Sequence, residues 1–214
     1  MGGGNTPPTL RGNMLLSELI TELQYRLEDD SINSRFPEVQ KIDAINNAYY
    51  SLLSIMDDKD LSKFKLTSTG ISLTTDNSSH FQYARIDNNA PLRVMNAYDE
   101  SNRIWCTITD KDTLFSYGNN YRYGTVISVC KTYTPNSDIT VIYATPSSVG
   151  SVTLWHIQEV DGMRTTDQYP VTDVLRPVIL GMAESELWRS DNASTRAKEA
   201  YSEAINILSA QEKK

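Results

Sequence analysis

The sequence predicts an α+β protein in which a helix pair from each end of the chain packs into one four-helix bundle, with a large antiparallel β-rich region inserted between the pairs. Two observations support this prediction. Apolar residues recur at helical spacing in residues 14–60 and 166–211, and between residues 61 and 165 the period changes to that of strands. Neither helix pair can bury its apolar stripe alone, so we expect the two pairs to pack together.

The N-terminal pair is predicted from two apolar stripes. The first has offsets of 0, 3, 4, 7 and 11 residues, which place its members on one face of an amphipathic helix: Leu16, Leu19, Ile20, Leu23 and Leu27. A polar turn follows, and Pro37 suits the first turn of the next helix, because the missing N–H of a proline costs nothing there. The second stripe continues on one face from Val39 to about Met56.

The C-terminal pair is predicted after residue 170. Thr172 or Asp173 can cap the first of these helices, and Pro177 is confined to its first turn. The closing helix begins at about Ser194 and has one mainly apolar face: Ala197, Ala200, Tyr201, Ala204, Ile205 and Leu208.

The region between the pairs consists of short runs rich in β-branched and aromatic residues. Clusters of Asn, Asp, Gly, Pro and Ser separate the runs, and three of these clusters, at residues 99–102, 118–120 and 134–138, are predicted as hairpin turns. Residues 1–13, rich in Gly and Pro, are predicted as a flexible arm without the apolar core of a signal peptide, and residues 212–214 as a tail.

The charge and the cysteines narrow the class of protein. A formal charge of −7, from 27 acidic and 20 basic side chains, disfavours sequence-specific binding to nucleic acid. In a ring of many copies an acidic lumen would let DNA slide, although the same charge also simply keeps a protein soluble. Cys106 and Cys130 lack metal-site spacing and are expected as buried free thiols. No apolar run is long enough to span a membrane.

The sequence singles out no catalytic, cofactor-binding or metal-binding constellation, and we expect no enzyme. His80 and His156 stand outside metal-ligand spacing, and the GxSxG, Walker and GxGxxG motifs do not occur. The acidic run at residues 57–60 lacks the glycine and the distal glutamate of a calcium loop. A hydrolase using paired carboxylates stays open as an alternative, because no pair is singled out.

The aromatic segment around residues 117–123 has two interpretations. It is a hairpin whose tyrosines pair across strands, or a tip that contacts nucleic acid or sugar. In an assembly it could contact a neighbouring subunit through four residues: Tyr117, Tyr121, Arg122 and Tyr123. The three tryptophans, Trp105, Trp155 and Trp188, are interpreted as core or interface anchors.

Several segments near the two ends, taken in order, resemble a known family. They are Leu16 to Asp29, Ile42 to Tyr49 with its Asn–Asn–Ala–Tyr core, Tyr169 to Leu175 with its proline-marked helix entry, and Ala183 to Trp188 followed by an Ala/Tyr-rich closing helix. Their order and spacing resemble the head–tail connector (adaptor) subunits of tailed bacteriophages. The resemblance covers residues 14–58 and 165–210, and the β-rich region is similar to the larger insertions of some connectors.

The resemblance implies a structural virion protein of the neck, made in the host cytoplasm. Such subunits form a homo-oligomeric ring, commonly of twelve copies, which docks under the portal protein and offers a platform for tail or stopper proteins. Double-stranded DNA passes through the lumen without sequence-specific binding. The closing helix and the C-terminal tail of the chain commonly reach the portal, which gives these portal-contact candidates: Tyr201, Ile205, Leu208, Glu212, Lys213 and Lys214. The β-rich region would face the phage tail or neighbouring subunits, so Tyr117, Tyr121, Arg122 and Tyr123 are candidates for either contact.

Two alternatives accompany this interpretation. Tyr201, Ile205 and Leu208 could only complete the core of the bundle. The abundance of Tyr and Trp in the β-rich region also fits a carbohydrate- or peptide-binding module of a phage tail.

Overall fold

The computed structural model describes these residues: 15–29, 34–56, 61, 66–75, 81–86, 91–117, 124–134, 137–145, 149–160, 163 and 165–212. The fold is α+β, with two mostly antiparallel sheets. The chain divides into two compact units, which we call the helical unit (residues 1–60 and 160–214) and the β unit (residues 61–159). The arm predicted at residues 1–13, the turn predicted at 118–120, and Lys213 and Lys214 lie outside the described residues.

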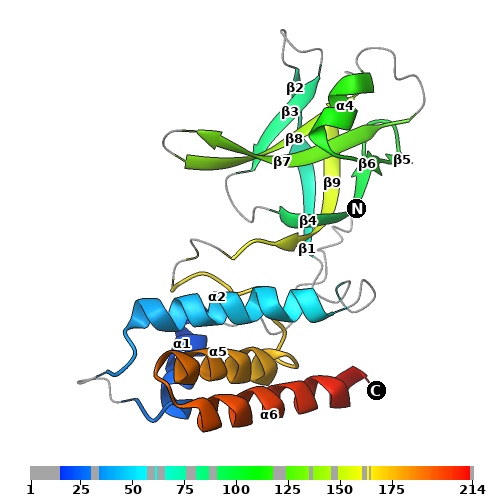
Figure 1. The fold of residues 1–214 in the computed structure, drawn as a ribbon. Helices are drawn as coiled ribbons and strands as arrows, with labels where there is room; N and C mark the ends of the chain where they lie inside the picture. Colours follow the sequence, from blue (N-terminus) through cyan, green and yellow to red (C-terminus); the bar gives the residue numbers. More distant parts are fainter. Residues whose placement is uncertain are drawn as a thin grey trace, which may run out of the picture. The chain divides into compact units, whose positions relative to one another are not determined.

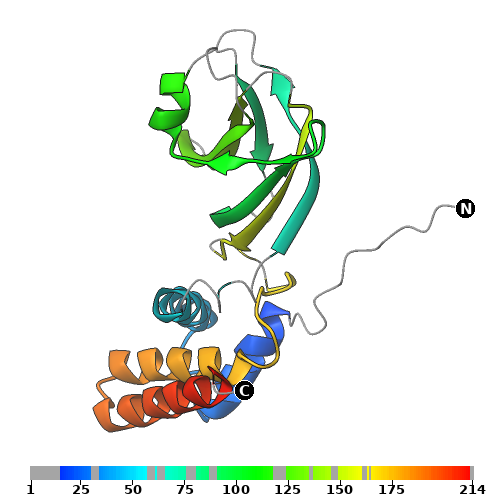
Figure 2. The same ribbon diagram turned by 90° about the vertical axis from the view of Figure 1, so that its right-hand side faces the viewer.

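The helical unit contains four helices, drawn in Figure 1, among the residues that are described: α1 (Leu16–Arg26), α2 (Glu38–Ile55), α5 (Arg176–Ser190) and α6 (Ser194–Glu212). They lie where the apolar stripes predict helices. In both Figure 1 and Figure 2, α5 lies between α2 and α6, and α1 packs against α2 and α5. Helices from both ends of the sequence therefore share one compact unit.

Helix α5 is buried on several faces, which distinguishes it from an amphipathic surface helix. Nine of its residues are buried: Val178, Ile179, Leu180, Gly181, Met182, Ala183, Ser185, Leu187 and Trp188. Because α2 covers one side and α6 another, the core around α5 requires both ends of the chain.

Backbone hydrogen bonds join the same two ends. The first N–H groups of a helix have no partner within that helix, and here Leu16 N–H donates to the carbonyl of Asp167 and Ser17 N–H to that of Thr165, at 3.0 and 2.9 Å. The Glu18 carboxylate reaches back to accept the N–H of Leu15 at 3.0 Å. The segment that precedes α5 thus caps α1.

Tyr169 makes a similar connection to α2. Its side chain is fully buried, and its hydroxyl lies 3.0 Å from Asn46 Oδ1 and 3.3 Å from the carbonyl of Ile45. Its ring meets that of Tyr49 edge to face, with 5.7 Å between centroids. A buried aromatic ring with a satisfied hydroxyl combines apolar packing with a fixed orientation.

The start of α5 differs from the prediction. Neither Thr172 nor Asp173 caps it with a side chain, since the helix begins at Arg176 after Leu175. The carbonyl of Thr172 accepts the N–H groups of Leu175 and Arg176, so a backbone turn immediately precedes the helix. Pro177 lies in the first turn, as predicted.

The β unit contains two sheets. One has the strand order β1-β9-β4-β5 and the other β2-β3-β8-β7-β6. The strands run as follows: β1 (Leu66–Ser72), β2 (Thr74–Thr75), β3 (Gln82–Ile86), β4 (Pro91–Asp99), β5 (Ile104–Trp105), β6 (Thr107–Ile108), β7 (Val126–Thr134), β8 (Ser137–Thr145) and β9 (Ser151–Gln158). The hairpin turns predicted at 99–102 and 134–138 do connect antiparallel pairs, β4 with β5 and β7 with β8.

The two sheets are joined at both edges by continuous segments. At one edge β1 passes into β2 at Leu73, and at the other β5 passes into β6 at Cys106, so each segment pairs first with one sheet and then with the other. Strands that change sheets form the corners of such sandwiches. Leu73 and Cys106 pack against a core that draws on both sheets, and that core includes Ala97, Ile127 and Leu154.

Two features of the β unit correct the sequence-based picture. Residues Lys111–Tyr117 form a helix, α4, so Tyr117 ends a helix and is not part of the predicted hairpin. Asp110 begins this helix, because its carboxylate accepts the N–H and the hydroxyl of Thr113 at 2.8 and 2.6 Å. The pair β6–β7 is parallel, in a region expected to be antiparallel.

We predict that Gly181→Val destabilises the protein by about 2 kcal/mol. A Cβ at Gly181 would lie 3.0 Å from the Ala204 Cβ and 3.3 Å from the Ala200 carbonyl oxygen, so a branched side chain forces α5 and α6 apart. Chemical denaturation measures the change. The matched control, Ser202→Val on the exposed face of α6, should change stability by less than about 0.5 kcal/mol. Equal effects of the two substitutions would contradict close packing of α5 on α6.

Candidate functional site

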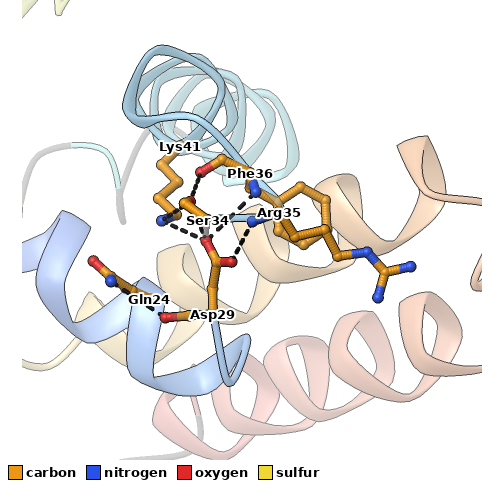
Figure 3. Close-up of polar contacts among 6 residues, drawn as sticks. All are labelled: Gln24, Asp29, Ser34, Arg35, Phe36 and Lys41. Carbon is orange, nitrogen blue, oxygen red and sulfur yellow. Dashed lines mark hydrogen bonds and ion pairs between the residues drawn. The ribbon is translucent and has the colours of Figure 1, made fainter. Parts of the chain in front are cut away.

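Among the residues that the structure describes, the most buried charged pair joins the end of α1 to the start of α2 (Figure 3). The Nζ of Lys41 lies 2.7 Å from Oδ2 of Asp29, and only 4% and 2% of these side chains are exposed. The Asp29 carboxylate also accepts the Ser34 hydroxyl at 2.6 Å and the backbone N–H of Arg35 at 2.6 Å. Its oxygens are therefore used within the fold, and it acts as a clasp between two helices.

The electrostatics of this clasp follow from its contacts. Burial by itself would raise the pKa of Asp29, but hydrogen bonds from Lys41, Ser34 and the Arg35 N–H, together with the Lys41 charge, lower the pKa to about 2. A carboxylate that is ionised and fully bonded at neutral pH does not serve as a general acid. The clasp is structural.

A second buried carboxylate, Asp99, organises the turn between β4 and β5. It accepts the N–H groups of Ser101 and Asn102, both at 3.0 Å, and the Thr125 hydroxyl at 2.6 Å. Burial opposes ionisation, but these hydrogen bonds outweigh it and lower the pKa of Asp99. Asp99 thereby connects the turn to Thr125, the residue before β7. The turn in turn positions β5, which follows it.

One histidine and the two cysteines lie among the described residues of the β unit. Burial lowers the pKa of His156 in β9. Burial, followed by the nearby Asp99 charge, raises the pKa of Cys106 to about 12, so its thiol stays protonated at neutral pH and is a poor nucleophile. Both cysteines are free, as expected, but each is half-buried and not buried. His80 lies outside the described residues.

Among the residues that the structure describes, no group of three His, Cys, Asp or Glu side chains could hold a metal ion. In the same part of the chain, no helix has the length and apolar character needed to cross a bilayer.

The portal-contact candidates on the closing helix, α6, differ in how far their side chains are exposed. Leu208 is buried in the row that faces α5, together with Ala197, Ala200 and Ala204. Tyr201 is 43% exposed and Ile205, one turn later, is half-buried. The α6 surface, defined by Tyr201 and Ile205, is thus available for contact. The Glu212 backbone ends α6, and its side chain lies outside the described part.

The contact candidates of the β unit are only partly described. Tyr117 is 38% exposed at the end of α4, whereas Tyr121, Arg122 and Tyr123 lie outside the described residues. The tryptophans differ from one another. Trp188 is buried in the helical unit, Trp155 is half-buried, and Trp105 is 64% exposed.

The structure places further exposed apolar side chains near Trp105 and Tyr117 in the sequence. The β unit has six exposed large apolar side chains among its described residues, and five of them lie between residues 104 and 117. These five side chains belong to β5, β6 and α4: Ile104, Trp105, Ile108, Phe115 and Tyr117. Strand β6 and helix α4 both contact β7, so this segment covers one corner of the sandwich. The signal in the sequence was the uncharged apolar run from Ile104 to Ile108, which periodicity alone assigns to a buried strand.

Comparison with protein-family models gave no match, and none of the curated proteins matches the chain. The surfaces above therefore stand on their own geometry.

We expect Asp29→Asn to lower the free energy of unfolding by about 3 kcal/mol at pH 7, because the Lys41 ammonium stays buried without a countercharge. The pKa of Asp29 is depressed from 3.8 to about 2, so its stabilisation is present above about pH 4 and is lost as pH falls through 2. The difference between wild type and variant should shrink over that window in urea titrations.

The control for this experiment is Glu22→Gln, which removes the carboxylate of the more exposed Glu22–Arg176 ion pair. Such pairs contribute less than about 1 kcal/mol. A difference between wild type and Asp29→Asn that stays constant down to pH 2 would show that Asp29 is not the titrating group.

Proposed function

We propose that this chain is a non-enzymatic structural subunit of a tailed-phage virion, a head–tail connector that forms a ring under the portal. The observation that supports the proposal most strongly is the sharing of one compact unit by helices from both ends of the chain, around the enclosed helix α5. The chain order, helix pair, β excursion, helix pair, is the order of the segments that resemble the connector family.

In this proposal the helical unit is the rigid hub, a four-helix bundle formed by α1, α2, α5 and α6. Its rigidity comes from contacts that span the chain. Besides the capped α1 and the buried Tyr169, Asn47 donates to Glu186 at 2.7 Å, and Arg176 pairs with Glu22. A hub that cannot flex presents the same faces in every copy, which ring closure by head-to-tail contacts requires.

The charge of the chain fits passage of DNA through the ring. Residues 61–159 contain eight basic and eight acidic side chains, so the whole formal charge of −7 belongs to the helical unit, with 12 basic and 19 acidic side chains. A ring of such units surrounds its lumen with negative potential, which repels DNA phosphates and disfavours sticking.

The direct test is assembly on the portal. The experiment purifies the full chain together with a portal protein from the same genome, and electron microscopy and mass photometry follow the mixture. A closed ring of copies docked on the portal is expected. Monomers that never dock would contradict the connector proposal.

A second candidate function, binding of a glycan by the β unit, is favoured by the exposed Trp105. Its ring meets Tyr98 and Trp155 with centroids 5.4 and 5.3 Å apart, so the three form an aromatic cluster on β5, β4 and β9. A glycan array probed with the full chain tests this function, and the absence of binding on such an array removes it.

The proposal gives different roles to two residues of α6, a portal contact for Tyr201 and a core position for Leu208. Tyr201→Ala should change the free energy of unfolding by less than about 0.5 kcal/mol, because the side chain is exposed, and should weaken portal binding roughly tenfold. Leu208→Ala should lower stability by about 3 kcal/mol, because the side chain is buried against α5. Thermal unfolding and surface plasmon resonance read the two effects separately.

Asn206→Ala, exposed on another face of α6, is the matched control and should leave both readouts unchanged. Normal portal binding by Tyr201→Ala would remove the α6 surface from the portal contact.

A further inference from the structure

A shallow groove of about 400 Å³ lies on one face of α1, beside the start of α5. We call it the α1 groove, and six residues line it: Ser17, Glu18, Thr21, Glu22, Tyr25 and Arg176. Tyr25 is 79% exposed, the highest exposed fraction among the large apolar side chains in the described part of the chain. An aromatic ring that stands in water beside a groove suits a contact that covers it.

The chain enters the helical unit at one end of this groove. Leu15 forms an antiparallel bridge with Gln168, and its N–H donates to the Glu18 carboxylate at 3.0 Å. In an antiparallel pair, the chain that precedes one residue is directed along the chain that follows its partner. The geometry at Leu15 therefore directs the preceding arm, predicted at residues 1–13, along the segment that follows Gln168.

That segment leads along α1 to the groove. It begins at Gln168, opposite Leu15, and ends at Arg176, which binds Glu22 in the middle of α1. An extended chain spans about 3.3 Å per residue, so Leu10 can lie up to about 17 Å from Leu15. Helix α1 has 11 residues and is therefore about 16 Å long. The arm is long enough to reach every part of the α1 groove.

The arm and the rest of the helical unit have opposite charges. Arg11 is the one charged side chain of residues 1–13. The helical unit has 12 basic and 19 acidic side chains, so without Arg11 it has 11 basic and 19 acidic ones, a formal charge of −8. In the groove Glu22 is paired with Arg176, whereas the Glu18 carboxylate accepts only a backbone N–H among the described residues. Glu18 is thus available to a guanidinium group.

The residues before Arg11 suit the exposed ring of Tyr25. Pro7, Pro8 and Leu10 offer apolar surface, and the two prolines favour an extended polyproline conformation. Proline-rich segments dock in grooves lined by aromatic rings, because a chain that is already extended loses little entropy when it binds. The order of these residues, apolar and then basic, matches a groove with Tyr25 at its far end and Glu18 beside Leu15.

We propose that the arm docks in the α1 groove of its own chain. Residues 7–10 cover the ring of Tyr25, and Arg11 pairs with Glu18. The arm then adds an outer layer to α1 and removes the most exposed aromatic ring of the helical unit from water. The inference does not rest on the connector proposal, because the groove and its occupant belong to one copy.

Trypsin measures the docking in the full chain, because a protease cleaves a segment that is free to enter its active site. Cleavage of the Arg11–Gly12 bond is followed by mass spectrometry in the wild type and in Tyr25→Ser. Loss of the ring should speed this cleavage roughly tenfold. Circular dichroism should stay unchanged, because the side chain is exposed. Val39→Ser, an exposed position of α2 outside the groove, is the matched control and should be cleaved at the wild-type rate.

A second variant, Glu18→Gln, tests the charged contact. The amide keeps an oxygen that can accept the N–H of Leu15, so the start of α1 is preserved, but the negative charge for Arg11 is lost. Cleavage after Arg11 should become roughly threefold faster. Equal cleavage rates in the wild type, both variants and the control would overturn the proposal.

A photo-cross-linker shows what the arm covers and in which copy. The full chain carrying Leu10→benzoylphenylalanine is illuminated, and the products are weighed and mapped by mass spectrometry. The expected product has the mass of one chain and is linked within the peptide that contains Tyr25. A product with the mass of two chains would place the arm on another copy and overturn docking within one chain. Links only to peptides outside the α1 groove would overturn it as well. Failure in these tests leaves the connector proposal standing, because none of them involves the portal.

Discussion

Helices α1 and α2 depend on groups that follow in the sequence more than a hundred residues later. The N–H groups that open α1 donate to carbonyls of Thr165 and Asp167, and the buried Tyr169 bonds the backbone and side chain of α2. Helix α5 in turn needs α2 and α6 to cover an apolar surface that extends around several of its faces. Unpaired backbone groups and exposed apolar faces are both costly, so each end of the chain is incomplete without the other.

This mutual dependence explains how the chain carries a large insertion. Residues 61–159 form a unit with its own core, drawn from both of its sheets, while the flanking helices close on each other. The helical unit has its own core around α5, covered by α2 and α6, and the surface of the β unit can serve contacts. The separation of charge follows the same division, with a neutral β unit and an acidic helical unit.

The helices could be predicted because their apolar residues repeat at a period that few other structures produce. Two β-hairpins could be predicted from their polar turns. Helix α4 was missed, although Asp110 and Thr113 carry the signal of a helix start, because the aromatic residues that follow favour a strand. The start of α5 shifted to Arg176 because a backbone turn replaced the expected side-chain cap.

The candidate surfaces depend on information that periodicity does not contain. Tyr201 and Leu208 belong to one predicted stripe, yet Leu208 faces α5 and Tyr201 faces outward, because the row of small residues opposite Gly181 decides how α6 is rotated. The exposure of Trp105 follows from the corner between two sheets, which forms only when distant strands pair. The burial of Lys41 beside Asp29 is likewise a product of tertiary structure.

Native-state hydrogen exchange tests most directly whether the two ends of the chain form one cooperative unit. Amide groups of α2, α5 and α6 should then exchange with the same opening free energy, and Gly181→Val should lower that free energy by the same amount in all three helices. The account would be contradicted if α2 exchanged with a lower opening free energy than α5 and α6. It would also be contradicted if Gly181→Val lowered the opening free energy of α5 and α6 but left that of α2 unchanged.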